Sequence, residues 1–336
     1  MENIRKYFEE KAIKNNIPYQ VQIDLTNKCN CNCIFCFEGN EHKNFSTPLS
    51  IDEIKKLLNE LKTLGTYSTG YSGGEPFCRE DTMEILEYTR YLGFATTIVT
   101  NGHLLTKNDL VKLSKLNLRR ITFSFHSHDM DNYNYHFGIN NISPTDILEK
   151  ITMLKKLGAN VGVAATVTKH NIKDLKQMYK LLLDNDINHI SFNMLTPGKK
   201  EINLLLPSTE SIENTVKDFP ELATKYLQNK NSSKSFLCSA GRISATVTYN
   251  GDIYACPFSN KNLGNLRKSS FKQIWFESDY LNFIRDAKES KFETCFKCKN
   301  KNICNMCLVR NENYSGSMFE PNKNFCELIT KFSKVL

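Results

Sequence analysis

Hydrophobic and polar positions alternate in short runs along the first 200 residues, and each run is followed by a helix-like segment. A two-residue period predicts strands, and apolar residues three or four apart predict helices. The predicted strands cover residues 19–26, 67–73, 94–100, 120–126, 159–167 and 187–195. The helices between them are predicted to begin near Ser50, Asp81, Thr106, Ser143 and Asn171, where side chains suited to capping occur.

Six strand–helix steps of this kind predict an α/β fold with a parallel sheet and helical crossovers. Six units are too few to close an eight-stranded barrel, so a partial (β/α)6 TIM-like barrel is expected. Functional groups gather at the C-terminal ends of the strands in such folds. The polar segments that follow the predicted strands are therefore expected to share one rim.

The strand–helix rhythm ends at residues 197–200, and a single helix is predicted over about residues 209–228 before a polar linker at 229–235. A hairpin is predicted from residues 244–248 and 253–256, because Asn-Gly between two apolar runs is a strong turn signal. A helix about Trp275 and a cysteine-dense tail follow. The expected domains are a core at residues 1–200, a helical linker at 201–237 and a small cysteine-rich domain at 238–336.

Four cysteines lie within eight residues after the first predicted strand, and three of them, Cys29, Cys33 and Cys36, have the spacing C-x3-C-x2-C. Three thiolates of one loop can hold three irons of a [4Fe–4S] cluster and leave the fourth iron without a protein ligand. An open position of this kind is where a reactant binds, as at a catalytic zinc. Cys31 does not fit the spacing and is interpreted as a bystander.

Composition limits the other classes of function. No apolar run approaches the roughly 18 residues that span a bilayer, and the N-terminus lacks the apolar segment of a signal peptide. Twelve cysteines in a chain that is not secreted indicate metal or redox chemistry, so a cytoplasmic location is expected. The net charge of +8 is spread out, and no basic run alternates with aromatic residues, so no nucleic-acid or membrane partner is expected.

The second motif lies after the second predicted strand and consists of Gly73, Gly74, Glu75 and Pro76. Together with the cysteine triple, it resembles the radical S-adenosylmethionine (SAM) enzymes over about residues 19–200. The resemblance implies that the triple holds a [4Fe–4S] cluster and that the amino and carboxylate groups of SAM chelate its open iron. Glycines allow a backbone to approach a ligand closely, and the carboxylate of Glu75 can accept hydrogen bonds from an ammonium group.

Four further positions resemble SAM-contacting positions of this family, namely Phe35, Asn101, Ser124 and Asn171. Phe35 precedes the third cysteine, where the family has an aromatic residue whose backbone meets adenine. Asn101 follows the third predicted strand, and Ser124 lies in the fourth. Asn171 is also explained as the N-terminal cap of the helix that follows.

The C-terminal cysteines resemble the seven-cysteine SPASM extension of radical SAM enzymes, which carries two auxiliary iron–sulfur clusters, here Cys238, Cys256, Cys295, Cys298, Cys304, Cys307 and Cys326. By position, Cys238, Cys256 and Cys307 are assigned to the first auxiliary cluster and the other four to the second, giving three [4Fe–4S] clusters in all. The gap of two residues between Cys304 and Cys307 departs from the usual three. Seven thiolates are one short of two full sets, so an oxygen or substrate ligand is expected. Structural zinc is the alternative.

The resemblance implies an oxidoreductase. A ferredoxin- or flavodoxin-like donor would reduce the first cluster, SAM would yield a 5′-deoxyadenosyl radical, and this radical would take a hydrogen atom from the substrate. Because SPASM relatives mostly modify peptides, the expected substrate is a ribosomally made precursor peptide that receives a thioether or carbon–carbon crosslink. Few residues lie outside the two motif regions, so a leader peptide would need a separate binding protein or none.

Three alternatives stay open. The first is oxidation or decarboxylation of a tetrapyrrole or another small cofactor precursor. The second is peptide epimerisation, for which Cys78 is the candidate hydrogen donor, although a small buried thiol is the preferred explanation of Cys78. The third is an iron–sulfur electron carrier or zinc-binding protein without enzymatic activity. The polar segment at residues 126–136 is interpreted as a surface lid, ahead of a substrate-contacting or metal-binding segment.

Overall fold

The computed structural model describes residues 2–36, 46–195, 200–228, 238–288, 291–301, 303–304 and 306–334. The chain forms two compact units. The first comprises Met1–Lys28, Phe45–Thr97 and Lys230–Asn322, and the second comprises Cys29–Asn44, Ile98–Asn229 and Lys323–Leu336. The division falls inside strand β3 (Ala95–Thr100). The predicted linker at residues 229–235 and the break at 197–199 lie outside the described residues.

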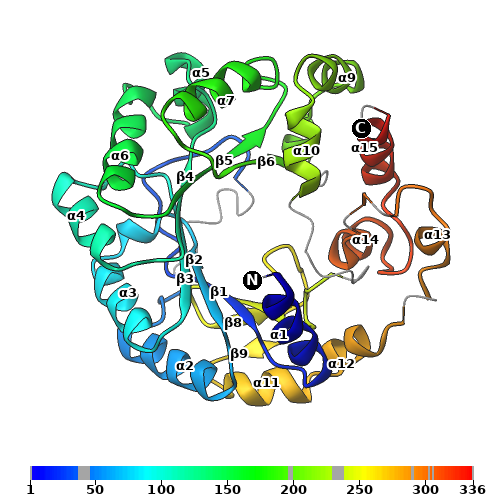
Figure 1. Cartoon of the computed structure of the whole chain (residues 1–336). Coiled ribbons are helices and arrows are strands. Elements are labelled where there is room, and N and C mark those ends of the chain that lie inside the picture. Colours follow the sequence, from blue (N-terminus) through cyan, green and yellow to red (C-terminus); the bar gives the residue numbers. More distant parts are fainter. Residues whose placement is uncertain are drawn as a thin grey trace. The chain divides into compact units, whose positions relative to one another are not determined.

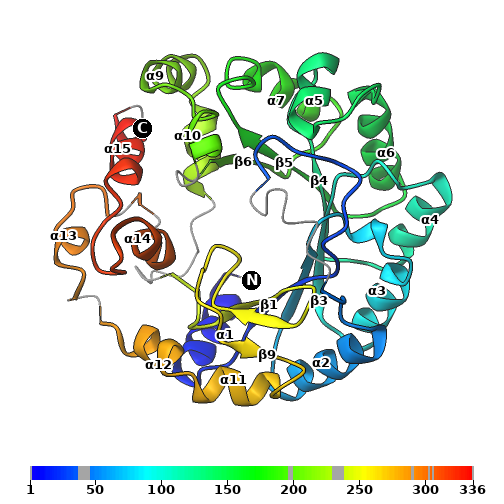
Figure 2. The same ribbon diagram turned by 180° about the vertical axis from the view of Figure 1, so that it is seen from behind.

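The first unit contains a mixed set of strands and the helices that cover them. Its strands pair in the order β2-β1-β7-β8-β9, with β1 parallel to both β2 and β7 and with antiparallel pairing from β7 to β9. These strands are β1 (Gln20–Asp24), β2 (Ser68–Ser72), β7 (Ser244–Val247), β8 (Asp252–Tyr254) and β9 (Gly264–Asn265). The helices are α1 (Glu2–Lys14), α2 (Ile51–Thr63), the short 3-10 helix η2 (Pro76–Cys78), α3 (Thr82–Tyr91), α11 (Phe271–Glu277), α12 (Asp279–Asp286), α13 (Glu293–Phe296) and α14 (Leu308–Ser315). Figure 2 shows α11 lying beside α2 and followed by α12.

The second unit repeats the strand–helix alternation. Its strands β4 (Arg120–Ser124), β5 (Val161–Val167) and β6 (Ile190–Met194) pair in parallel in chain order. Its helices are α4 (Lys107–Lys115), α5 (Met130–Phe137), α6 (Pro144–Lys156), α7 (Leu175–Asp184), α8 (Lys200–Asn203), α9 (Thr209–Asp218), α10 (Glu221–Gln228) and α15 (Lys323–Ser333). Helices α4 and α6 lie next to each other along these strands (Figure 1). Among the described residues, no helix has the length and apolar character needed to cross a membrane.

Parallel strands joined through helices confirm the predicted α/β class with a partial TIM-like core. Local capping accounts for several helix starts. The Ser50 side chain accepts from the N–H of Glu53 while the Glu53 carboxylate accepts from the N–H of Ser50, and Thr106 and Asp109 form the same reciprocal pair. Each pair satisfies two N–H groups that a helix start leaves open. The predicted starts of α2 and α4 are therefore confirmed.

Two predicted helices differ from the structure. The single helix expected over residues 209–228 is two helices, α9 and α10, which are separated at Pro220. Phe219 before this proline has φ −137° and ψ 74°, because a residue before proline is disfavoured in the helical region. The prediction that Asn171 caps the next helix is also wrong. Helix α7 begins at Leu175, and its cap position is Asp174.

Strand β7 pairs directly with β1, which the sequence pattern did not indicate. Residues Gln20 to Ile23 are in parallel register with Ser244 to Val247, and β8 continues the sheet as the second strand of the predicted hairpin. Gly251 in the turn has φ +90°, as the predicted Asn-Gly turn requires. The cysteine-rich region that follows residue 238 thus shares a sheet with the first strand of the chain.

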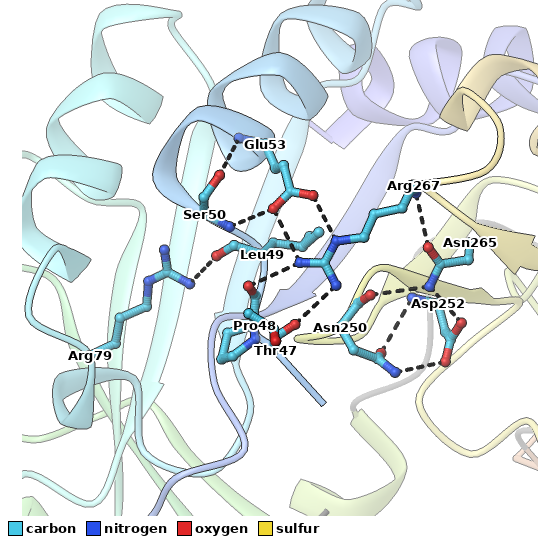
Figure 3. A network of polar contacts seen from close by, with 10 residues as sticks. All are labelled: Thr47, Pro48, Leu49, Ser50, Glu53, Arg79, Asn250, Asp252, Asn265 and Arg267. Carbon is cyan, nitrogen blue, oxygen red and sulfur yellow. Dashed lines mark hydrogen bonds and ion pairs between the residues drawn. The ribbon is translucent and has the colours of Figure 1, made fainter. Parts of the chain in front are cut away.

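Arg267, just after β9, ties the hairpin region to the start of α2 (Figure 3). Its guanidinium donates to both carboxylate oxygens of Glu53, at 2.8 and 3.2 Å. It also donates to the carbonyl oxygens of Thr47 and Pro48, at 3.0 and 3.1 Å. The hydrogen bond from Arg267 lowers the pKa of Glu53 to about 2. One planar cation therefore satisfies several acceptors on the segment at residues 47–53, which is distant in sequence from Arg267.

We expect Arg267→Ala to lower the free energy of unfolding by about 1 kcal/mol, since the pair is partly exposed but bidentate. Because the pKa of Glu53 is lowered, this contribution is present above the usual carboxyl pKa and is lost as pH falls toward 2. Thermal unfolding midpoints measured between pH 7 and pH 3 would show the difference from the unaltered protein shrinking. Lys176→Ala, which removes an exposed pair with Asp218, is the control and should change little. Equal effects of the two variants would contradict the prediction.

Candidate functional site

The cysteine loop, residues 29–36, follows β1 in sequence and belongs to the second unit. Cys29, Cys33 and Cys36 are all half-buried. Burial, then the neighbouring Cys36 and Cys29, raise the pKa of the Cys33 thiol to about 12. Neighbouring thiolates repel one another, so all three thiols can ionise together only beside a positively charged group. The iron of an iron–sulfur cluster is such a group, so this set of donors fits a cluster.

Helix α5 supports the cysteine loop through backbone hydrogen bonds. The N–H of Asn32 donates to the carbonyl of Phe137 at 2.9 Å, and the N–H of Ile34 donates to the carbonyl of His136 at 3.1 Å. The last carbonyls of a helix lack partners within the helix, and here the loop supplies them. Gly138 ends α5 with φ +59°, and a Cβ at this position would lie 2.1 Å from the carbonyl oxygen of Asn32. The loop approaches α5 so closely that only glycine fits.

The interpretation of residues 126–136 as a surface lid is therefore wrong. Asp129 caps α5 by accepting from the N–H of Asn132, and the helix buries Tyr133 and His136 completely. His136 is held by the carbonyl of Asn132 and the hydroxyl of Thr168. Asp129, His126 and His136 are used for capping and internal hydrogen bonds, which a hydropathy pattern cannot distinguish from exposure.

Phe35, predicted to lie near adenine, packs its ring edge-on against His126 with the ring centroids 4.7 Å apart. His126 is buried, and its Nδ1 accepts from the N–H of Thr166 at 3.0 Å. Burial lowers the pKa of His126 to about 3, so the imidazole is neutral at pH 7. The residue before the third cysteine of the loop thus packs against an uncharged ring.

Asn101 contacts the cysteine loop directly. Its Nδ2 donates to the Oδ1 of Asn30 at 2.8 Å and approaches the Sγ of Cys31 at 3.4 Å, while its Oδ1 accepts from the N–H of His103 at 2.9 Å. Cys31 therefore has defined partners, and its Sγ also lies 3.3 Å from the Nδ1 of His103. Burial lowers the pKa of His103 to about 4, so this ring too is neutral at pH 7.

Asn171 is fully buried and uses its amide to join the ends of two strands. Its Nδ2 donates to the carbonyls of His126 and Thr166, at 2.8 and 2.9 Å, and its Oδ1 accepts from the N–H of Thr168 at 2.9 Å. This pattern fixes the segments that follow β4 and end β5. Ser124 is the half-buried last residue of β4.

In the first unit, the glycine pair packs against the residues that lead into the cysteine loop. A Cβ on Gly73 would lie 2.3 Å from the carbonyl oxygen of Thr26, and one on Gly74 would lie 2.2 Å from that of Lys28. The N–H groups of Gly74 and Glu75 donate to these same two carbonyls, at 2.7 and 2.8 Å. The glycines are therefore required by contact within the chain itself, which the sequence analysis did not anticipate.

The rest of the motif forms a short, buried turn. Glu75 is buried, and its carboxylate accepts from the N–H of Phe77 at 3.2 Å, which caps η2. Pro76 is the first residue of η2 and is also buried. Cys78 is the last residue of η2 and is half-buried. Its backbone N–H donates to the carbonyl of Glu75 at 2.9 Å.

Cys238, Cys256 and Cys307 are neighbours in the first unit. The Cys238 thiol donates to Cys307, which raises the pKa of Cys238 and lowers that of Cys307 to about 6. Burial, with the nearby Cys307 contributing, raises the pKa of Cys256 to about 11. Cys307 also caps α14 by accepting from the N–H of Arg310. The structure thus brings together the three residues that the resemblance assigns to one cluster.

The other four cysteines of this region divide between the units. Cys295, Cys298 and Cys304 lie in the first, where the N–H of Cys298 donates to the carbonyl of Cys295 at 3.2 Å. Cys326 is exposed on α15, which belongs to the second. Over the residues that are described, no three His, Cys, Asp or Glu side chains converge as a single metal ion would require.

Sequence reasoning missed three residues around the cysteine loop: His103, Tyr133 and Gly138. Gly138 carried a usable signal, because a capping Asp followed nine positions later by a glycine is typical of the two ends of a short helix. His103 and Tyr133 carried none. Their Nε2 and hydroxyl oxygen lie 2.8 Å apart only because β3 and α5 bring them together.

Family models match two parts of the chain. Residues 23–182 match the model of the Radical SAM superfamily. Residues 238–299 match the SPASM model, described as an iron–sulfur cluster-binding domain. The two matches cover the regions that hold the cysteine loop and most of the C-terminal cysteines.

Curated relatives align over most of the chain. An AdoMet-dependent heme synthase of Methanosarcina barkeri (strain Fusaro) is 24% identical, over 91% of this chain and 95% of the relative. An Fe-coproporphyrin III synthase of the same organism is 25% identical, over 84% of this chain and 81% of the relative.

Solved structures share the fold. SuiB of Streptococcus suis, bound to its precursor peptide SuiA, has a TM-score of 0.74 and 20% identity, covering 96% of this chain and 80% of that one. The enzyme anSMEcpe, with bound AdoMet and a Cp18Cys peptide, has a TM-score of 0.70 and 19% identity, covering 94% of this chain and 96% of that one.

We expect Gly138→Ala to disrupt the support of the cysteine loop, with Gly158→Ala as a matched control. Both glycines follow a helix with positive φ, but nothing lies within 4 Å of a Cβ at Gly158. Each substitution should cost about 1 kcal/mol of backbone strain because φ is positive, seen in thermal unfolding. Gly138→Ala should cost more than this, because its Cβ would overlap the carbonyl oxygen of Asn32. Only Gly138→Ala should also lose most of the iron bound after anaerobic reconstitution. Equal iron content in the two variants would show that this contact is not needed.

Proposed function

Because the chain belongs to the radical SAM superfamily and carries a SPASM iron–sulfur cluster-binding domain, we propose that it cleaves SAM and oxidises an organic substrate by hydrogen-atom abstraction. The observation that carries this proposal is the cysteine loop, in which three half-buried thiols have the required spacing. The fixed backbone of the loop supports it further, because ligands held in place bind a cofactor at a smaller entropic cost.

Cys29, Cys33 and Cys36 would hold the SAM-binding [4Fe–4S] cluster. When bound, such a cluster supplies a low-potential electron and an open iron for SAM. The residues of the chain would position the reactants and exclude water from the site. Phe35 and the neutral, buried His126 make the support behind the third cysteine apolar, which keeps water from the thiolate next to it.

The proposed SAM contacts are Phe35, Gly73, Gly74, Glu75, Pro76, Asn101 and Ser124. Among these, Glu75 is the group suited to an ammonium, since a buried carboxylate pairs strongly with a cation. Asn171 is proposed to act indirectly. Both of its amide hydrogens already join the segments after β4 and at the end of β5, so it would position neighbouring groups.

We assign Cys238, Cys256 and Cys307 to one auxiliary [4Fe–4S] cluster and Cys295, Cys298, Cys304 and Cys326 to a second. The contact between Cys238 and Cys307, with Cys256 nearby, supports the first assignment. Bound there, an auxiliary cluster supplies an electron acceptor, which suits a net two-electron oxidation. A ferredoxin- or flavodoxin-like protein is the proposed external donor.

As substrate we propose a ribosomally made peptide that receives a thioether or carbon–carbon crosslink. The support is the fold shared with SuiB, which was solved with a precursor peptide. A tetrapyrrole is the second candidate. It is favoured by relatives that are named for heme and Fe-coproporphyrin III synthesis and that align over 84% or more of the chain.

We expect anaerobically reconstituted protein with SAM and dithionite to release 5′-deoxyadenosine, measured by liquid chromatography. Cys29→Ala should abolish this release, because two thiols cannot hold the cluster. Cys326→Ala should still release some 5′-deoxyadenosine but should not convert the substrate. Intact clusters without any 5′-deoxyadenosine would overturn the enzymatic proposal, and identical behaviour of the two variants would overturn the division of roles.

We expect mass spectrometry to separate the substrate classes. A small peptide encoded beside the gene should lose two hydrogens if a crosslink forms, whereas unchanged mass with deuterium uptake from solvent would indicate epimerisation. If the tetrapyrrole proposal holds, a propionate side chain of iron-coproporphyrin III should lose carbon dioxide together with two hydrogens, one to the 5′-deoxyadenosyl radical and one as the carboxyl proton. Turnover of the porphyrin but not of the peptide would overturn the peptide proposal.

A further inference from the structure

The cysteine loop contains one thiol more than its proposed cluster uses. Cys31 lies two positions from Cys29 and two from Cys33, and its own N–H donates to the Sγ of Cys29 at 3.4 Å. A fourth thiolate on the cluster would complete a four-cysteine set and leave no iron open. Something in the chain must keep this thiol from binding.

The Cys31 thiol is engaged by two polar side chains of the same unit. Its Sγ lies 3.3 Å from the Nδ1 of His103 and 3.4 Å from the Nδ2 of Asn101. Both distances fall within the range of hydrogen bonds to sulfur. Cys31 is therefore a partner in a defined network, which distinguishes it from a thiol that faces open space.

His103 is itself fixed on several sides. Its Nε2 lies 2.8 Å from the hydroxyl of the buried Tyr133, and its ring packs edge-on against Phe137 with centroids 4.9 Å apart. The backbone N–H of His103 donates to the Oδ1 of Asn101. Its carbonyl accepts from the Nζ of Lys150 at 3.1 Å. A ring restrained at both nitrogens and at its backbone cannot turn away from the thiol without breaking these contacts.

The residues on both sides of Cys31 are restrained as well. Asn30 accepts from the Nδ2 of Asn101 at 2.8 Å, and the N–H of Asn32 donates to the carbonyl of Phe137 at 2.9 Å. A hydrogen bond to sulfur is much weaker than an iron–thiolate bond, so it does not compete by strength alone. The contacts of the Cys31 thiol with His103 and Asn101 act together with these backbone anchors, so the thiol is held by several contacts at once.

We propose that His103, held by Tyr133 and Asn101, is a positioning residue that keeps Cys31 out of the coordination of the cluster. Three thiols then bind, and the fourth iron stays open. This inference rests on the proposed function. It also assigns a role to Cys31, a residue outside the SAM motif.

The first test compares His103→Leu, Cys31→Ser and the double variant, each reconstituted anaerobically and studied by EPR in the reduced state with and without SAM. We expect the unaltered protein and Cys31→Ser to show a SAM-dependent change in the spectrum. In His103→Leu the SAM-dependent change in the spectrum should be smaller by a factor of about five or more. A factor of about five corresponds to the free energy of one ordinary hydrogen bond. The double variant should regain the SAM response, because no spare thiol remains.

The second test uses metal-free protein and does not depend on SAM chemistry. Alkylation of Cys31 by iodoacetamide, followed by peptide mass spectrometry, should be about fivefold faster in His103→Leu than in the unaltered protein. Tyr133→Phe, which removes only the hydroxyl that holds His103, should give an intermediate rate. Thermal unfolding midpoints identify any variant that fails to fold.

The outcomes separate the inference from the proposed function. A double variant as defective as His103→Leu, or a His103→Leu protein with a full SAM response, would overturn the inference. Equal alkylation rates in the unaltered and His103→Leu proteins would do the same. If the unaltered protein shows no SAM response but the alkylation rates differ as expected, the proposed function fails and the restraint on Cys31 stands.

Discussion

The second unit depends on two backbone hydrogen bonds between the cysteine loop and the end of α5. A loop that presents thiols has no regular structure of its own, so its N–H groups need partners elsewhere. The end of a helix has the opposite need, because its last carbonyls are unpaired. Asn32 and Ile34 donate to Phe137 and His136, and each segment satisfies the other. The positions of Phe35 and Cys31 follow from this contact, since both are adjacent to the residues it fixes.

Glycine has the same physical role in both units. Gly138 in the second unit and the glycine pair at residues 73–74 in the first are each placed where a Cβ would overlap a carbonyl oxygen. In each case that oxygen belongs to the cysteine loop or to the residues that precede it. Close backbone contact thus requires glycine at each of these positions, whatever further contacts the glycines make.

Local features of the fold could be predicted, and features that join distant segments could not. The capping pairs at Ser50 and Thr106 and the Asn-Gly turn act within a few residues, so the pattern that forms them is visible in the sequence. The break at Pro220 was also visible and was given too little weight against the helical periodicity. By contrast, the network of Cys31, His103 and Tyr133 needs the loop, the segment after β3 and α5 together. Of the candidate site, spacing identified the thiols but not what holds them.

The pairing of β1 with β7 has a consequence for the order of assembly during synthesis. Residues 20–23 emerge first, yet one edge of this strand obtains its partner only when residues 244–247 have been made. Until then the edge exposes unpaired backbone groups to other chains, a hazard for aggregation. The first strand of the chain therefore keeps one edge open through most of synthesis, and the closing of that edge depends on residues from the last third of the sequence.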